Sequence, residues 1–277
     1  DKKTDPAVVT MGQDGRFAVS LLSGHLGGAN DLARKVAVLT GGQAVITTAT
    51  DLQRVPALEV VATDLGLKFA HLAALPAISR TLSEGGKIGV HDPGDFLWPS
   101  LTAWPELFFR RPGPPEENLP SVSVDWGLSP LPSATLALRP PALAVGVGCH
   151  RDCPADELGE LAESALREGR LSSQAVAVLA TVQSRGDPDL APAKLAKRWR
   201  VPLITYATER LSAVGTPNPS ETVLRRIGAA SVCEASAILA ARMGPLLVDK
   251  RKAARATCAV ALIDYRSSGS VPPGPTG

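Results

Sequence analysis

The chain has 277 residues and a formal net charge of +2, so it carries neither the strongly basic surface of a nucleic-acid-binding protein nor an acidic tail. Only 4% of its residues are aromatic, and no apolar run is long enough to span a bilayer. We expect no signal peptide, because the first residues lead into no apolar segment. The four cysteines form no CxxC pair, which predicts reduced thiols in a cytoplasmic protein.

The first residues predict a strand–turn–helix–strand unit, which we place in an N-terminal α/β domain over residues 1–56. Because this domain opens directly on a strand, we expect it to lack its first elements. Apolar residues recur at strand and helix spacing. These patterns predict strands over residues 7–11, 16–22 and 43–48 and a helix over residues 31–39 that ends at Gly41-Gly42.

A glycine-rich turn, residues 23–30, joins the second strand to this helix. Backbone N–H groups at a helix N-terminus are unpaired, and glycines let an anionic ligand approach them. The turn therefore predicts binding of a phosphate or carboxylate, with His25 as a group that titrates near neutral pH. The alternative is that the glycines only form a tight turn and the asparagine only caps the helix. The candidate ligand-binding residues here are Ser23, Gly24, Gly27, Gly28 and Asn30.

Residues 57–141 form a middle segment whose second half is rich in proline. Because the prolines gather in two clusters, we interpret that half as a loosely packed arm followed by a linker. The expected elements are helices over residues 58–67 and 76–82, a strand over residues 87–91 and an edge strand over residues 121–125.

A second α/β domain is expected over residues 142–266, followed by a disordered tail over residues 267–277. Apolar strands end there in polar or glycine-containing loops, and ligands of open parallel sheets bind at the carboxyl ends of strands. A hairpin is predicted across the basic turn Asp249-Lys250-Arg251-Lys252. The whole chain therefore predicts an α/β fold of two Rossmann-like open-sheet domains joined by the proline-rich middle segment. Candidate binding residues in the second domain are Gly148, Cys149, Arg151, Arg185, Asn218 and Ser220.

The run Leu22-Ser23-Gly24-His25-Leu26-Gly27-Gly28-Ala29-Asn30 resembles the signature of the cobalt-precorrin-5A hydrolase family, the CbiG family of anaerobic cobalamin biosynthesis. The second domain resembles the C-terminal domain of that family in the runs Pro217-Asn218-Pro219-Ser220-Glu221 and Ser231-Val232-Cys233-Glu234-Ala235. The resemblance extends over nearly the whole chain, to about Asp264.

The resemblance implies a hydrolase that opens the ring-A acetate δ-lactone of cobalt-precorrin-5A and then releases acetaldehyde. It implies no cofactor, because the cobalt is carried by the tetrapyrrole substrate, and it implies a precorrin methyltransferase as a fused or receiving partner. We expect no nucleic-acid partner, no membrane partner and no metal site of the protein's own. The many carboxylates of such a substrate match helix N-termini and the guanidinium groups of Arg151 and Arg185.

Lactone opening needs an activated water and donors for an oxyanion, and release of acetaldehyde needs a base. We take His25 as the first candidate base and Glu234 as the second, with the N–H groups of Gly27 and Gly28 as oxyanion donors. A structural role stays open for both candidates. His25 would then only hydrogen-bond the turn, and Glu234 would form a capping box with Ser231.

Cys149 is either a nucleophile or a small buried thiol beside a glycine turn. Together with His150 and Cys153 it lacks a fourth ligand for a metal site. The alternative function is a non-catalytic carrier that binds and hands over a corrinoid intermediate. Such a carrier needs the carboxylate-binding loops but has no need of His25. A generic α/β protein that binds another anionic metabolite is the third interpretation.

Overall fold

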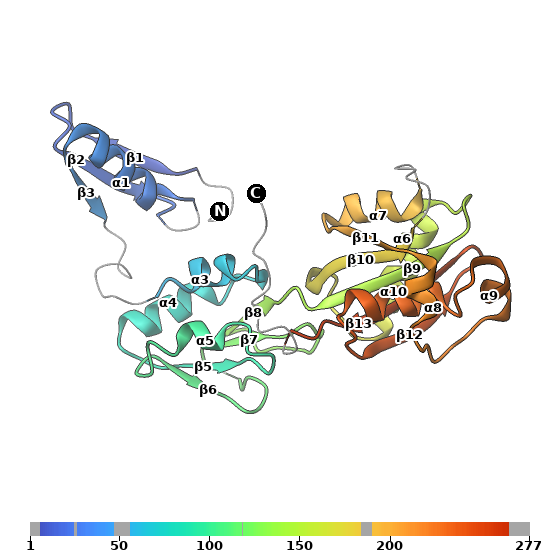
Figure 1. Ribbon diagram of the computed structural model, residues 1–277. Coiled ribbons are helices and arrows are strands. Elements are labelled where there is room, and N and C mark those ends of the chain that lie inside the picture. Colours follow the sequence, from blue (N-terminus) through green and yellow to red (C-terminus); the bar gives the residue numbers. More distant parts are fainter. Residues whose placement is uncertain (1–5, 25–26, 47–55, 118, 184–189, 266–277) are drawn as a thin grey trace. The chain divides into compact units, whose positions relative to one another are not determined.

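The computed structural model describes residues 6–24, 27–46, 56–117, 119–183 and 190–265, whose strands form three sheets (Figure 1). The chain divides into two compact units. The first contains two of the sheets and the second contains the third, with the segment Asp125–Pro130 joined to the second unit. Both units combine strands and helices, which confirms the α/β class.

The N-terminal sheet has the order β1-β2-β3, with β1 antiparallel and β3 parallel to β2. Helix α1 packs against Ala18 of β2 through Ala33 and Ala37. Gly41 ends α1 with φ 69°, and its N–H donates to the carbonyl of Ala37, which confirms the predicted stop. The elements are β1 (Val8–Met11), β2 (Phe17–Leu22), α1 (Ala29–Thr40) and β3 (Gln43–Ile46). Residues 47 and 48, predicted as the end of the third strand, lie outside the described residues.

The middle sheet has the order β4-β8-β7-β5-β6, and the pairs β8–β7, β7–β5 and β5–β6 are parallel. One face carries the large apolar residues of a core that also contains Leu58, Leu75 and Ile78 from the helices. The elements are α3 (Leu58–Asp64), β4 (Lys68–His71), α4 (Leu75–Ser83), β5 (Ile88–His91), α5 (Trp98–Leu101), β6 (Phe108–Arg110), β7 (Ser121–Val124) and β8 (Thr135–Arg139).

The expectation of a loosely packed arm with an edge strand is wrong for β7 and β8. Every residue of both strands is buried, and β7 lies between β8 and β5 in the interior of the sheet. Ser121 and Thr135 share a hydrogen bond of 3.0 Å between their hydroxyl groups, which satisfies two polar groups inside the sheet. The prolines therefore flank two short buried strands.

The C-terminal sheet has the order β11-β10-β9-β13-β12. Strands β9, β10 and β11 are parallel, whereas β13 is antiparallel to β9 and to β12. The strands are β9 (Leu143–Cys149), β10 (Val176–Val182), β11 (Leu203–Tyr206), β12 (Leu246–Lys252) and β13 (Ala256–Leu262). The helices are α6 (Ala155–Glu168), the short 3₁₀ helix Ser173–Ala175, α7 (Ala191–Trp199), α8 (Thr208–Ser212), α9 (Glu221–Ile227) and α10 (Val232–Ala240).

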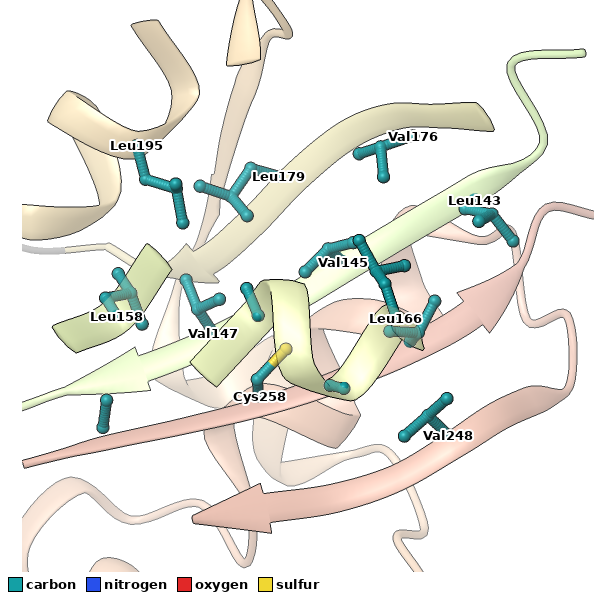
Figure 2. Close-up of a cluster of buried hydrophobic side chains, with 14 of the residues drawn as sticks. Leu143, Val145, Val147, Leu158, Leu166, Val176, Leu179, Leu195, Val248 and Cys258 are labelled. Atoms are coloured by element: carbon teal, nitrogen blue, oxygen red, sulfur yellow. The ribbon is translucent and has the colours of Figure 1, made fainter. Parts of the chain in front are cut away.

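Helices cover both faces of this sheet. On one face, Leu158 and Leu166 of α6 and Leu195 of α7 form one cluster with alternate residues of β9 and with Leu179 of β10, as Figure 2 shows. On the other face, α10 crosses β9 at Gly146, where a Cβ atom would lie 1.9 Å from the carbonyl oxygen of Cys233. Glycine is therefore required for the close approach of α10 to β9.

None of the helices in the described part of the chain is long and apolar enough to cross a membrane. All four cysteines are free thiols. The tail over residues 267–277 lies outside the described residues.

Candidate functional site

A cavity of about 490 Å³ lies at the carboxyl end of β9, in the second unit. One wall is formed by the end of β9 and the turn that follows it, residues 148–152. The start of α10 and the β12–β13 hairpin form the others, together with Ser220 before α9 and Val223 within it. The cavity thus lies at the sheet edge predicted for ligand binding.

The local sequence explains how the elements around this cavity come together. A Cβ atom on Gly148 would lie 2.9 Å from Oγ1 of Thr257 and 3.3 Å from Cβ of Val232, so glycine lets β13 and α10 approach β9 closely. The turn after β9 is then fixed at both ends. The N–H of His150 donates to the carbonyl of Arg255 at 2.9 Å, and the N–H of Cys153 donates to the carbonyl of His150 at 3.1 Å.

Among the charged residues that line the cavity, four are cationic, and Asp152 supplies the single carboxylate. Arg255 is engaged within the protein, because its Nη2 lies 2.9 Å from Oε2 of Glu157 and its own N–H donates to the same carboxylate at 2.7 Å. Within the described residues, Arg151 and Lys252 form no ion pair. These two side chains are therefore available to an anionic ligand.

The basic run expected as the turn of a hairpin lies instead within strand β12, and the turn is formed by residues 253–255. The register of β12 with β13 shifts between Val248, which pairs with Val260, and Arg251, which pairs with Cys258. Three residues of β12 thus span two of β13, as in a β-bulge. The shift places Lys250 on the α10 side of the sheet. No pattern in the sequence predicts this register shift.

Glu234 lies behind the cavity wall, in the first turn of α10, and its side chain is fully buried. Its carboxylate accepts hydrogen bonds from Nδ2 of Asn218 at 2.8 Å, from the N–H of Asn218 at 3.3 Å and from the N–H of Lys250 at 3.3 Å. Ser231 occupies the N-cap position but makes no side-chain capping bond in the described structure. The alternative of a capping box is therefore wrong.

Burial raises the pKa of the Cys149 thiol to about 11, and the neighbouring Cys153 adds to the shift. Burial also raises the pKa of Cys153. Both groups are therefore neutral thiols near pH 7, which fits a packing role better than that of a nucleophile. In the described residues, no group of three or more His, Cys, Asp or Glu side chains is placed to hold a metal ion.

The glycine-rich turn of the first unit folds back on itself. The N–H groups of Ala29 and Asn30 donate to the carbonyls of Ser23 and Gly24 at 3.1 and 2.9 Å, so these two donors are used within the turn. Gly28 is the N-cap residue, and Asn30 is buried inside α1. The alternative that Asn30 caps the helix is therefore wrong. The oxyanion role of Gly27 and Gly28 stays a prediction.

The structure brings part of the predicted site together. Gly148, Cys149, Arg151 and Ser220 line the cavity, whereas Asn218 and Glu234 form the layer behind it. Ser220 stands at the N-cap position of α9, without a side-chain capping bond in the described structure. His25 and Arg185 lie outside the described residues. The lining residues that were not predicted as site residues include Lys250, Lys252, Arg255, Ser231 and Thr257.

A cavity with four cationic side chains at the carboxyl end of the central strand of an α/β domain has the chemistry to hold an anionic small molecule. Family models described as cobalamin synthesis G N-terminal and cobalamin synthesis G C-terminus match residues 1–51 and 143–261.

Two similar proteins agree with these matches. The cobalt-precorrin-5A hydrolase of Priestia megaterium is 30% identical over 285 residues, which cover 96% of this chain and 74% of that protein. The enzyme of the same name from Salmonella typhimurium (strain LT2) is 32% identical over 248 residues, covering 84% and 68%. The chain therefore belongs to the cobalt-precorrin-5A hydrolase family. The crystal structure of CobE, a protein from the cobalamin biosynthetic pathway, is 34% identical and covers 44% of this chain and 91% of CobE, with a TM-score of 0.41.

Proposed function

We propose that this protein is a cobalt-precorrin-5A hydrolase of cobalamin biosynthesis, which opens the ring-A acetate δ-lactone and releases acetaldehyde. The observation that carries the proposal is the similarity to two cobalt-precorrin-5A hydrolases along 96% and 84% of the chain. The cobalt belongs to the substrate in this reaction, so the proposal invokes no cofactor. The product would pass to a precorrin methyltransferase. The free thiols of all four cysteines support a cytoplasmic location.

The cavity of the second unit suits a substrate with several carboxylates. We assign Arg151 and Lys252 to binding these groups, because both line the cavity and neither is engaged by an acidic partner among the described residues. The N-terminus of α10 adds the backbone of Ser231 and Val232 to the same wall, where its partial positive charge favours an anion. Arg185, whose position is not described, is a further candidate carboxylate ligand.

The reaction proceeds in two steps. In the first, water adds to the lactone carbonyl and the ring C–O bond breaks, which yields a carboxylate and a free hydroxyl. In the second, a base removes the proton of that hydroxyl, the adjacent C–C bond breaks, and acetaldehyde leaves. The electron pair stays on the macrocycle and is protonated there. We assign the base to His25, because an imidazole titrates in the range that the second step requires.

The test is an anaerobic incubation of the protein with cobalt-precorrin-5A, followed by mass spectrometry of the tetrapyrrole and trapping of aldehyde. We expect conversion of the substrate and one acetaldehyde per turnover. His25→Ala should lower kcat by about 10²–10⁴-fold and leave substrate binding in place. A wild-type protein that binds the substrate and returns it unchanged would overturn the proposal in favour of a carrier.

A further inference from the structure

A circuit of hydrogen bonds joins three residues at the back of the cavity. Glu234 of α10 receives both the backbone N–H and the side-chain amide of Asn218. The carbonyl of Asn218 in turn accepts a hydrogen bond from Nζ of Lys250. The backbone of Lys250 returns to the Glu234 carboxylate through its N–H at 3.3 Å. The loop before α9, helix α10 and strand β12 are thereby tied to one another at a single carboxylate.

The three residues differ in their access to the cavity. Lys250 lines it, whereas Glu234 is 0% exposed and is absent from its lining. Among the described residues, each donor to the carboxylate comes from Asn218 or Lys250, and none of these hydrogen bonds is directed at the cavity. A group in this position touches the residues that build the wall rather than a ligand within it.

The sequence around Asn218 makes the position of its loop depend strongly on the hydrogen bonds of Asn218. Asn218 lies between Pro217 and Pro219, whose nitrogen atoms carry no hydrogen, so neither proline donates a backbone hydrogen bond that could hold the loop. The loop is anchored at its far end by the N–H of Ser220, which donates to the carbonyl of Ala230 at 2.8 Å. Before this anchor, the hydrogen bonds from Asn218 to Glu234 fix the position of the Asn218 carbonyl. That carbonyl in turn holds the ammonium group of Lys250.

We propose that Glu234 is a positioning residue, which holds Asn218 so that its carbonyl keeps the Lys250 ammonium at the cavity wall as a third cation for the substrate's carboxylates. This inference rests on the proposed function for its substrate. It replaces the role of Glu234 as a base, because the carboxylate is buried and directed at its neighbours. Lys250, rather than Glu234, is the member of the circuit that meets the ligand.

The decisive experiment is a double-mutant cycle on substrate affinity. Glu234→Gln and Lys250→Met should each raise KM for cobalt-precorrin-5A by about tenfold, with kcat within about threefold of the wild type. Because Glu234 acts through Lys250, the double variant should bind no more weakly than Lys250→Met alone. Additive losses, or a Glu234→Gln variant that loses kcat at unchanged KM, would overturn the assignment.

A matched control lies on the same strand. Arg251 is the next residue of β12 and its Nε donates to Oε2 of Glu168 at 2.9 Å, on the α6 side of the sheet. Glu168→Gln removes a carboxylate partner of β12 that lies on the other face, and it should leave KM unchanged. If Glu234→Gln does not fold, Glu234→Asp keeps the charge on a side chain one methylene shorter, and it should show a smaller rise in KM of the same kind.

A measurement without substrate separates this proposal from the function on which it rests. Limited acetylation with acetic anhydride, read by mass spectrometry, reports how accessible each lysine amine is. Acetylation of Lys250 should be severalfold faster in Glu234→Gln and unchanged in Glu168→Gln. An unchanged rate in Glu234→Gln would overturn the positioning role even if the wild type is active. An increased rate in a protein that does not turn over the substrate would leave the positioning intact and reject the hydrolase.

Discussion

The β2–α1 turn of the first unit and the β9–α6 turn of the second both join a strand to a helix, yet their surroundings differ. The first belongs to a three-stranded sheet whose buried hydrophobic cluster consists of the alanines Ala18, Ala33 and Ala37. The second belongs to a five-stranded sheet with leucines and valines packed on β9, and a third element, the β12–β13 hairpin, reaches its end. The cavity at the second turn is therefore formed by neighbouring elements as well as by the turn itself.

The two regions also need glycine for different reasons, Gly28 in the β2–α1 turn and Gly146 within strand β9. Gly28 adopts φ 78° with open space around its missing Cβ, so its role is conformational. Gly146 precedes the β9 turn by a few residues and has no positive φ, but a Cβ there would meet the backbone of α10. The first glycine permits a backbone shape, and the second permits two elements to touch.

The largest expected effect tests the contrast between the two cores. Leu158→Ala, at a fully buried position against β9, should destabilise its unit by about 3 kcal/mol because it leaves a cavity that the sheet cannot fill. Val36→Ala, in the partly buried rim of the alanine core, should cost about 1 kcal/mol in the first unit. Hydrogen exchange followed by mass spectrometry reads each unit separately. Equal losses of protection in the two units would contradict the difference between their cores.

The glycine contrast predicts a smaller effect. Gly146→Ala should cost about 2 kcal/mol, because α10 must move away from β9 to admit the methyl group. Gly28→Ala should cost about 1 kcal/mol through backbone strain, and Gly28→Asn should be better tolerated because asparagine adopts positive φ more readily.

Urea unfolding of each variant measures these differences. Gly215→Ala is the control in the second unit, since its Cβ would meet nothing within 4 Å. A Gly146→Ala variant as stable as this control would contradict the close approach.

The cationic side chains of the cavity are expected to have two different roles. Arg151 and Lys252 bind the substrate, whereas Arg255 stabilises the turn. Arg151→Gln and Lys252→Gln should each raise KM by about tenfold, with a smaller change at high salt, because each removes a charge that is available to a carboxylate. Arg255→Gln should instead lower the stability of the turn, because this guanidinium is bound to Glu157. The expected pattern would be contradicted if Arg255→Gln alone weakened substrate binding. Steady-state kinetics at two salt concentrations, with thermal unfolding of each variant, provides both readouts.

The smallest effect concerns the thiol at the end of β9. The folded pKa of Cys149 is about 11, above the value of about 8.5 for a free thiol. The stability gained from keeping this thiol neutral is fully present below pH 8.5 and is lost as pH rises toward 11, because the unfolded chain ionises first. Denaturant midpoints of the second unit should fall between pH 8.5 and 10 less steeply in Cys149→Ala than in the wild type. Parallel pH profiles of the two proteins would contradict this pKa.

Much of the fold could be predicted from local patterns. Helices α1, α3 and α4 follow apolar spacing, and β5 follows a short apolar run, so each was predicted within a few residues of its bounds. Strand β7 was predicted, but at an edge of the sheet, and β8 was missed, because short buried strands between prolines resemble a linker until their parallel partners are known. Pairing between distant strands is not encoded in any local period.

The site was predicted in part for the same reason. Gly148 and Arg151 follow directly from a strand that ends in a polar loop, and the structure places both in the cavity lining. Lys250 was expected in a turn, because a register shift in β12 leaves no mark on its sequence. The spacing of Ser231 and Glu234 fits a capping box, but Asn218 and Lys250 supply the hydrogen bonds to the carboxylate instead.

The antiparallel pairing of β13 with β9 also sets when the cavity first exists during synthesis. Cys149 pairs with Ala256, about a hundred residues later in the chain. When β9, α6 and β10 have left the ribosome, the wall formed by the end of β9 is therefore present. The wall that bears Lys250, Lys252 and Arg255 has not yet been made. The nascent chain must hold the edge of β9 unpaired until the hairpin emerges, and it is exposed to mispairing over that interval.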